Sequence, residues 1–223
     1  MKIKHIFLGI VLSISTLFLF AQDSMTYVYQ VVSDGEISDS VEWRVMHKEN
    51  IILLESTLLG TSYSYECNPD FTIRTMDMKQ NNSDHLLFSD SGSEIFIRGK
   101  KDGDNINTKI SKSKYPWYQN IGWAASNMLA TGKDELTFSL IRPDNFSILN
   151  MQAKVMEEER IMYENSLHDV VKVKITLTGL LKHFWSGYYW YRKDDFKMVK
   201  YQGNSGPPGS PNLTMVLINE FVN

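Results

Sequence analysis

The chain has 223 residues, one cysteine and a formal net charge of −3, with 23 lysines and arginines against 26 aspartates and glutamates. A slightly acidic chain without a basic stripe argues against nucleic acid as a partner, and a single cysteine excludes an internal disulfide. The length is that of one large β domain or two small ones.

The first 21 residues are typical of a secretory signal peptide. Lysines and a histidine precede an uncharged apolar run at residues 6–20, and Ala21 offers a small residue for cleavage. The run is shorter than the about 20 apolar residues of a membrane-spanning helix, and Cys67 lies too far away to carry a lipid anchor at the cut. We expect residues 22–223 to be exported as one soluble domain, periplasmic or secreted, with no stable membrane span after cleavage.

Short stretches of alternating apolar and polar residues then follow one another, separated by turn signals such as Asp34-Gly35. Period two is the pattern of strands with one face on a core. Cys67 alternates with Tyr63 and Tyr65, which favours a small buried hydrophobe over a reactive thiol. The predicted strands are residues 25–31, 41–47, 51–59, 61–67, 71–78, 84–88, 94–98 and 105–110, and their regular succession predicts an antiparallel sheet.

The pattern changes at residues 117–130, where we predict one helix. Pro116 suits its first turn, and Gly132 suits its end. Apolar residues recur in it at helical spacing: Tyr118, Ile121, Ala125, Met128 and Leu129. After this helix, strands are predicted at residues 136–141, 146–156 and 160–163. The three glutamates at 157–159 are expected to form a solvated loop between the last two.

Residues 170–203 predict three antiparallel strands, and the middle one is aromatic on both faces. Phe184, Tyr188 and Trp190 would share one face. Trp185, Tyr189 and Tyr191 would share the other. A sheet with one solvent-exposed face should not carry large rings on both sides of a strand. We therefore expect another part of the chain or a ligand to pack over the second face. A Pro- and Gly-rich loop at residues 204–211 and a last strand at 213–222 complete the chain.

Two covers are possible, and they imply different functions. The 117–130 helix can lie over the sheet and bury the rings as core. Alternatively, the rings line a groove for a lipid or peptide. The ligand-binding residues would then be Trp185, Tyr189 and Tyr191 of the strand and Trp117 and Trp123 of the helix.

Catalytic and metal sites find little support in the sequence. Residues 203–207 (Gly-Asn-Ser-Gly-Pro) superficially resemble the nucleophile segment of trypsin-like serine proteases, but Asn204 stands where that family has aspartate, and a turn is the better interpretation of Ser205. The histidines lack metal-ligand spacing. The segment Asp102-Gly103-Asp104 lacks the further ligands of a calcium loop. We predict no catalytic residue, no metal and no cofactor.

The order of elements resembles the periplasmic half-barrel proteins related to the Lol-type outer-membrane lipoprotein carrier, particularly relatives of unknown function. The resemblance rests on the meander after a signal peptide, the helix that interrupts it, the Tyr189-Trp190-Tyr191 strand, a short Asp turn and the segment Lys200-Tyr201-Gln202-Gly203 before a Gly/Pro loop. It implies a curved sheet wrapped around helices, with a hydrophobic concave face that receives acyl chains.

The expected fold is therefore mainly β, a large curved antiparallel sheet (half-barrel) packed on one central helix. The expected function is a non-enzymatic envelope protein that binds a lipid, or the acyl chain of an acylated protein, on the concave face. The alternative is an interaction or scaffold module for envelope proteins without a small-molecule ligand. A serine hydrolase centred on Ser205 comes third. A hollow between the helix and the sheet would favour the carrier, and solid packing would favour the scaffold.

Overall fold

The computed structural model describes residues 24–58, 60–80, 84–163, 166–204 and 210–223. The predicted signal peptide and Ser205 lie outside them. The described residues form one α-helix, α1 (Ile121–Ala130), one short 3-10 helix, η1 (Gly179–His183), and fourteen strands: β1 (Ser24–Ser33), β2 (Glu36–Lys48), β3 (Ile51–Leu58), β4 (Thr61–Cys67), β5 (Ile73–Gln80), β6 (Asp84–Asp90), β7 (Glu94–Lys101), β8 (Asp104–Ser111), β9 (Glu135–Ile141), β10 (Ile148–Tyr163), β11 (Ser166–Leu177), β12 (Ser186–Arg192), β13 (Met198–Asn204) and β14 (Asn212–Val222).

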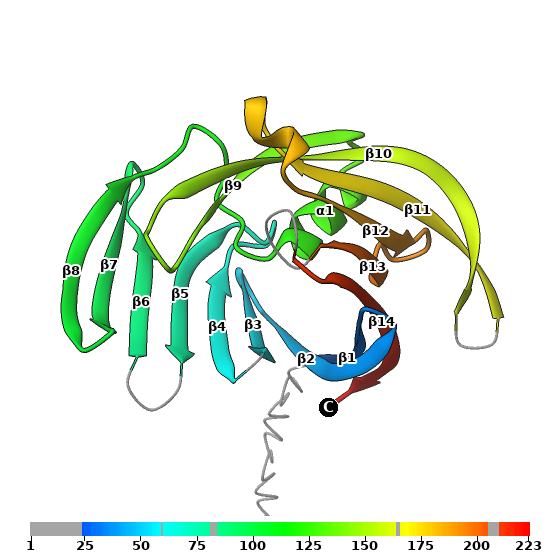
Figure 1. Cartoon of the computed structure of the whole chain (residues 1–223), viewed down its shortest axis with the longest axis horizontal. Helices are drawn as coiled ribbons and strands as arrows, with labels where there is room; N and C mark the ends of the chain where they lie inside the picture. The colour runs from blue at the N-terminus through cyan, green and yellow to red at the C-terminus, as the bar shows by residue number, and fades with distance from the viewer. Residues whose placement is uncertain (1–23, 59, 81–83, 164–165, 205–209) are drawn as a thin grey trace, which may run out of the picture.

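All fourteen strands belong to one antiparallel sheet, in the order β8-β7-β6-β5-β4-β3-β2-β1-β14-β13-β12-β11-β10-β9. Two meanders, β1–β8 and β9–β14, are joined where β1 pairs with β14. The strands at the two ends of the sheet, β8 and β9, therefore come from the middle of the chain. Figure 1 shows the sheet curved into an arch with α1 inside it. The predicted mainly β fold, a curved antiparallel sheet with one α-helix, is confirmed.

The helix begins four residues later than predicted. Residues 117–120 lie outside the helix, because the backbone around Trp117 bonds to two strands. The Ile73 amide donates to the Trp117 carbonyl at 2.9 Å, and Trp117 forms a parallel bridge with Ser139 of β9. Asn120 then caps the helix by accepting from the Trp123 amide at 3.3 Å. The end of α1 at Ala130 agrees with the prediction.

The expected loop at residues 157–159 is wrong, because β10 runs unbroken for 16 residues. The partner strand explains this difference. Lys172 of β11 lies opposite Glu157, and their side chains form an ion pair at 2.9 Å, so the like charges on β10 are offset across the ladder. A bulge between Val155 and Glu157 shifts the register at the start of the acidic run.

The three predicted strands of the aromatic region are β11, β12 and β13. Strand β12 begins at Ser186, so Phe184 and Trp185 belong to the preceding connection and not to the strand. Both aromatic faces of β12 are covered. Tyr191 is fully buried on the side of α1. On the other side, three lysine ammonium groups lie 4.6–5.6 Å from the rings of Tyr188 and Trp190, so their aliphatic stems shelter the rings from water.

Candidate functional site

The space between the body of α1, from Ala124 to Leu129, and the sheet is solid. Ala124 and Ala125 have no exposed surface and Met128 has 1%. The Tyr191 hydroxyl donates to the Gly122 carbonyl at 3.0 Å, and the Ser126 hydroxyl donates to the Phe196 carbonyl at 2.7 Å. These contacts fix the helix on the C-terminal meander, so no ligand fits beneath this part of the sheet.

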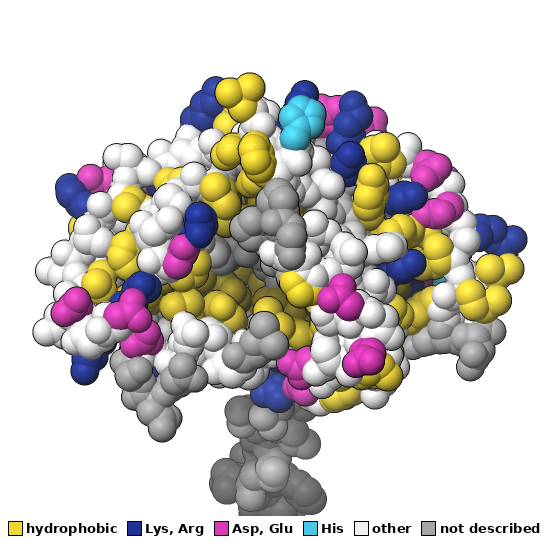
Figure 2. Space-filling view, in the orientation of Figure 1, with side chains coloured by type: hydrophobic (Ala, Val, Ile, Leu, Met, Phe, Trp, Pro, Cys, Tyr) yellow, Lys and Arg dark blue, Asp and Glu magenta, His cyan; other side chains and the backbone are white. Residues whose placement is uncertain are grey.

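A groove of about 320 Å³ lies beside the first residues of α1. It runs between residues 119–122 and the inner faces of β2–β4 and β12–β14, and Figure 2 shows hydrophobic side chains on the floor of the hollow beneath the arch. The side chains and backbone that line it are mostly apolar or aromatic: Val41, Trp43, Ser56, Leu58, Tyr63, Tyr65, Gln119, Asn120, Ile121, Gly122, Pro143, Tyr189, Met198, Tyr201 and Met215.

Stacked aromatic rings form two parts of the groove wall. Tyr65 stacks between Trp43 at 6.2 Å and Tyr63 at 6.1 Å, and Tyr189 lies 4.8 Å from Tyr201 between ring centroids. Burial raises the pKa of Tyr65 above its ordinary value and raises the pKa of Tyr201 to about 12. The phenols are therefore uncharged near neutral pH, and the wall presents rings and neutral hydroxyls to a ligand.

One polar group in the groove is buried without a partner. Ser56 follows Ile52 and Leu54 on the inner face of β3 and is 7% exposed. Its Oγ makes no hydrogen bond with any described residue. Leaving a buried hydroxyl unpaired costs about 1–3 kcal/mol, so a polar atom of a bound molecule would gain by pairing with it.

The structure separates the five aromatic residues that the sequence nominated. Tyr189 lines the groove. Trp123 lines a smaller neighbouring void and stacks on Phe71 at 4.9 Å. Tyr191 and Trp117 are packed in the core at 0% and 2% exposure. Trp185 donates from Nε1 to the Asn204 carbonyl at 3.0 Å, at the root of the β11–β12 connection.

Sequence reasoning missed the N-terminal wall of the groove. Trp43, Ser56, Tyr63 and Tyr65 lie on three adjacent strands, and each occupies an inner position of its own alternation. The alternation was visible in the sequence. The register that places Ser56 beside both Trp43 and Tyr63 was not, because short turns and a repeating pattern leave several pairings open.

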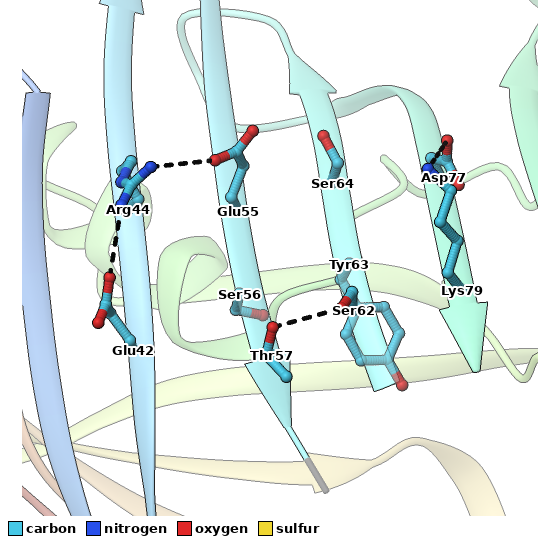
Figure 3. Close-up of a pocket in the computed structure, with 10 residues that line it drawn as sticks. All are labelled: Glu42, Arg44, Glu55, Ser56, Thr57, Ser62, Tyr63, Ser64, Asp77 and Lys79. Carbon is cyan, nitrogen blue, oxygen red and sulfur yellow. Dashed lines mark hydrogen bonds and ion pairs between the residues drawn. The ribbon is translucent and has the colours of Figure 1, made fainter. Parts of the chain in front are cut away.

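A second depression lies on the outer face of β2–β5 and is polar (Figure 3). Arg44 pairs with Glu42 at 3.7 Å and with Glu55 at 3.8 Å, and these charged side chains are about half exposed. Because the charges neutralise one another in water, this surface is a solvated sheet face.

Among the described residues, no group of three or more His, Cys, Asp and Glu side chains could hold a metal ion. No helix of the described part is both long and apolar enough to cross a bilayer.

Gly187 shapes the wall of the groove by leaving room for a ring. It pairs with Gly203, and a Cβ at Gly187 would lie 2.7 Å from the ring of Tyr201. We expect Gly187→Ala to lower the free energy of unfolding by about 1–3 kcal/mol, because the Tyr201 ring must move. Urea denaturation measures the loss. Ser186→Ala, one residue away on the opposite face, is the control and should change stability by less than about 0.5 kcal/mol. Equal stabilities for the two variants would contradict the prediction.

No protein-family model matches the chain, and no curated protein matches its sequence. Solved structures do match. A β-barrel-like protein with a domain of unknown function, DUF1849, from Brucella abortus gives a TM-score of 0.58 at 5% identity over 91% of this chain and 98% of that chain. The hypothetical lipoprotein YmcC from Escherichia coli K12 gives 0.37 at 12% identity over 88% and 86%. A LolA superfamily protein from Nitrosomonas europaea gives 0.26 at 9% identity over 89% and 84%. The chain thus shares its fold with the β-barrel-like Brucella abortus protein of unknown function.

Proposed function

We propose that this protein acts in the cell envelope, most simply the periplasm, and carries or holds one apolar ligand in the groove without changing it chemically. The ligand is an acyl chain, either of a lipid or of an acylated protein. The observation that supports this proposal is the combination of stacked aromatic walls with the buried, unpartnered Oγ of Ser56. Pockets of this composition, mostly apolar with a few polar groups, are typical of small-molecule sites.

The dimensions of the groove favour a small cargo. Ligand pockets usually enclose about 300–1,000 Å³, and a groove of about 320 Å³ lies at the bottom of this range. Each methylene removed from water contributes about 0.8 kcal/mol. About ten methylenes therefore supply roughly 8 kcal/mol, the free energy of micromolar binding before the cost of association is subtracted. We infer that one acyl chain, and not a lipid with several chains, occupies the groove.

The groove contains little that could catalyse a reaction. Its titratable side chains are tyrosines, and burial raises the pKa of Tyr63, Tyr65, Tyr189 and Tyr201 away from neutrality. A general base works best when its pKa lies near the working pH. These residues support a binding role for the groove.

Blocking the groove tests the proposal. Ser56→Phe adds a ring inside the groove, whereas Thr57→Phe adds the same ring on the outer face of the same strand. We expect Ser56→Phe to weaken the binding of a fluorescent fatty acid by at least about tenfold, a free-energy change of about 1.4 kcal/mol. Thr57→Phe should bind as the unmodified protein does. Native mass spectrometry of protein recovered after export would show whether a ligand accompanies it.

Two results would contradict this function. One is a failure of the unmodified protein to bind any acyl probe or to carry a ligand from the cell. The other is equal binding by the Ser56→Phe and Thr57→Phe variants when both remain folded by circular dichroism. Ser56→Ala removes the hydroxyl without filling the groove, so it should weaken a ligand whose polar end reaches Oγ and spare a purely hydrocarbon probe.

The alternative of an envelope interaction module stays a prediction. Addition of a partner strand would use an open edge of the sheet, and β8 is one such edge. Its sequence, Asp-Asn-Ile-Asn-Thr-Lys-Ile-Ser, is largely polar and mostly exposed. An edge of this composition disfavours strand addition, so the groove remains the better candidate site.

A further inference from the structure

An apolar tip projects from the connection between β11 and β12. Leu180 is 91% exposed, Phe184 54% and Leu181 48%, and none of the residues in η1 is buried. Figure 1 shows this turn in gold at the top of the molecule, and Figure 2 shows hydrophobic and basic side chains together at the same tip. Three large apolar side chains within five residues form a cluster, whereas single exposed apolar residues are ordinary on protein surfaces.

The tip is held firmly at its root. The Thr178 amide donates to the Asn150 carbonyl of β10 at 2.9 Å, and within the tip the Phe184 amide closes the turn by donating to the Leu181 carbonyl at 2.9 Å. Trp185 packs against the core cluster beneath α1 and donates from Nε1 to Asn204. The leucines and the phenylalanine are thus presented to solvent by an ordered turn that is anchored on both sides.

Positive charge accompanies the apolar side chains. Lys182 and His183 lie between Leu181 and Phe184 and are exposed, and among the described residues Lys182 has no ion-pair partner. Elsewhere on β11 and β12, Lys172 and Arg192 are paired with acidic side chains, so Lys182 and His183 supply the basic character of the tip itself.

We propose that residues 180–184 form a docking tip that inserts into the surface of an anionic phospholipid bilayer. Leu180, Leu181 and Phe184 would enter the boundary between headgroups and acyl chains, and Lys182 would contact lipid phosphates. Apolar insertion combined with basic residues is the usual basis of reversible interfacial binding. A stable protein partner generally covers about 800 Å² on each side, far more than a five-residue turn offers, whereas a bilayer needs only the tip itself.

The tip and the groove share one anchoring point. The Tyr201 hydroxyl donates to the Asn204 carbonyl at 3.1 Å, the same carbonyl that accepts from Trp185. Tyr201 lines the groove. Docking of the tip would therefore bring one wall of the groove toward the bilayer. The use of this arrangement rests on the proposed function, whereas the docking of the tip does not.

A probe attached to the tip tests the proposal directly. Leu181→Cys and Ile37→Cys place an environment-sensitive fluorophore at the tip and at an exposed position on β2 outside it, while Cys67 is buried. The exported protein is mixed with vesicles of phosphatidylethanolamine and phosphatidylglycerol, or of phosphatidylcholine alone. We expect a blue shift only for the probe at position 181, and a stronger one with the anionic vesicles. Because the readout is local, binding through any other part of the chain would not produce it.

Substitutions separate the apolar from the charged contribution. Leu180→Ser with Phe184→Ser should weaken vesicle binding by at least about tenfold, whereas Ile37→Ser should leave it unchanged. Lys182→Gln should weaken binding to anionic vesicles by about fivefold and reduce the preference for them. A probe at position 181 that stays in water with every vesicle, or that shifts only when another protein is added, would overturn the proposal. Fatty-acid binding by the Leu180→Ser, Phe184→Ser variant should be retained, so a failure of docking is distinguishable from a failure of the groove.

Discussion

Tyr191→Ala should lower the free energy of unfolding by about 3–5 kcal/mol, the range found when a buried aromatic side chain is truncated. The Tyr191 side chain is fully buried between β12 and α1, and its hydroxyl donates to the Gly122 carbonyl. Truncation leaves a cavity and removes the contact that ties the start of the helix to the sheet. Because domains of this kind are stable by only about 5–15 kcal/mol, the variant should unfold at much lower urea concentration.

Two further variants separate the contributions of the ring and the hydroxyl. Tyr191→Phe keeps the ring and should cost about 1–2 kcal/mol through the lost hydrogen bond. Tyr188→Ala alters the opposite face of the same strand, where the ring is only partly buried beneath lysine stems, and should cost less than Tyr191→Ala. Urea denaturation followed by circular dichroism gives all three values. A loss below about 1 kcal/mol for Tyr191→Ala would show that α1 is not held by this contact.

Arg192→Met is expected to cost about 2–3 kcal/mol, more than an exposed ion pair contributes and less than the about 3–5 kcal/mol of a fully buried one, because Asp195 and Glu220 are 30% and 25% exposed. Only 12% of the Arg192 side chain is exposed, and its guanidinium donates to Glu220 at 2.6 Å and to Asp195 at 2.6 Å. The cluster joins the β12–β13 turn to β14. Lys193→Met is the matched control: its ion pair with Glu158 is largely exposed and should contribute less than about 1 kcal/mol. Equal losses in the two variants would contradict the assignment.

The same cluster should make stability depend on acid pH. Hydrogen bonds from Arg192 lower the pKa of Glu220 below 4.5, although burial opposes the change. Burial acts to raise the pKa of Asp195, but hydrogen bonds from Arg192 and Lys197 bring it below 3.8. Because both folded-state pKa values lie below the unfolded ones, the stabilisation is fully present above about pH 4.5 and is lost as pH falls through the folded-state values.

Urea midpoints measured from about pH 6 down to about pH 3 give the size of this acid-dependent term. The unmodified protein should lose stability across the lower part of that range. Arg192→Met should show a flatter profile, because Glu220 and Asp195 then titrate nearer their ordinary values. Parallel profiles for the two proteins would rule out a contribution from this cluster to acid sensitivity.

Local pattern was a good guide to the strands and a poorer one to their ends. Alternation along β4 and β11 predicts a buried inner face, and Tyr65, Cys67, Val173 and Ile175 are buried as expected. Burial also raises the pKa of Cys67 to about 12, as a small core residue requires. The helix start was misplaced because Trp117 satisfies its backbone by bonding to β5 and β9, partners that no local pattern reveals.

The structure brings the five nominated aromatic residues to different places in the fold. The aromatic strand correctly indicated that rings required cover, and Tyr189 does line the groove. The body of α1 leaves no hollow over β12, because its small residues Ala124 and Ala125 allow it to pack tightly on Tyr191. The groove opens beside the first residues of the helix, Ile121 and Gly122. The helix therefore packs tightly on the sheet along its body, whereas a groove lies beside its first residues.

The β architecture, the helix near residue 121 and the aromatic strand could be predicted from the sequence, because alternation and residue preference act over a few neighbouring residues. The division of the rings between the core and the groove wall could not be predicted in the same way. That choice depends on the pairing of β1 with β14 and on the register of β2–β4, which bring Ser56, Tyr63 and Tyr201 around one space. Contacts between residues more than a hundred positions apart are set by the packing of the whole sheet, and no local stretch of sequence specifies them.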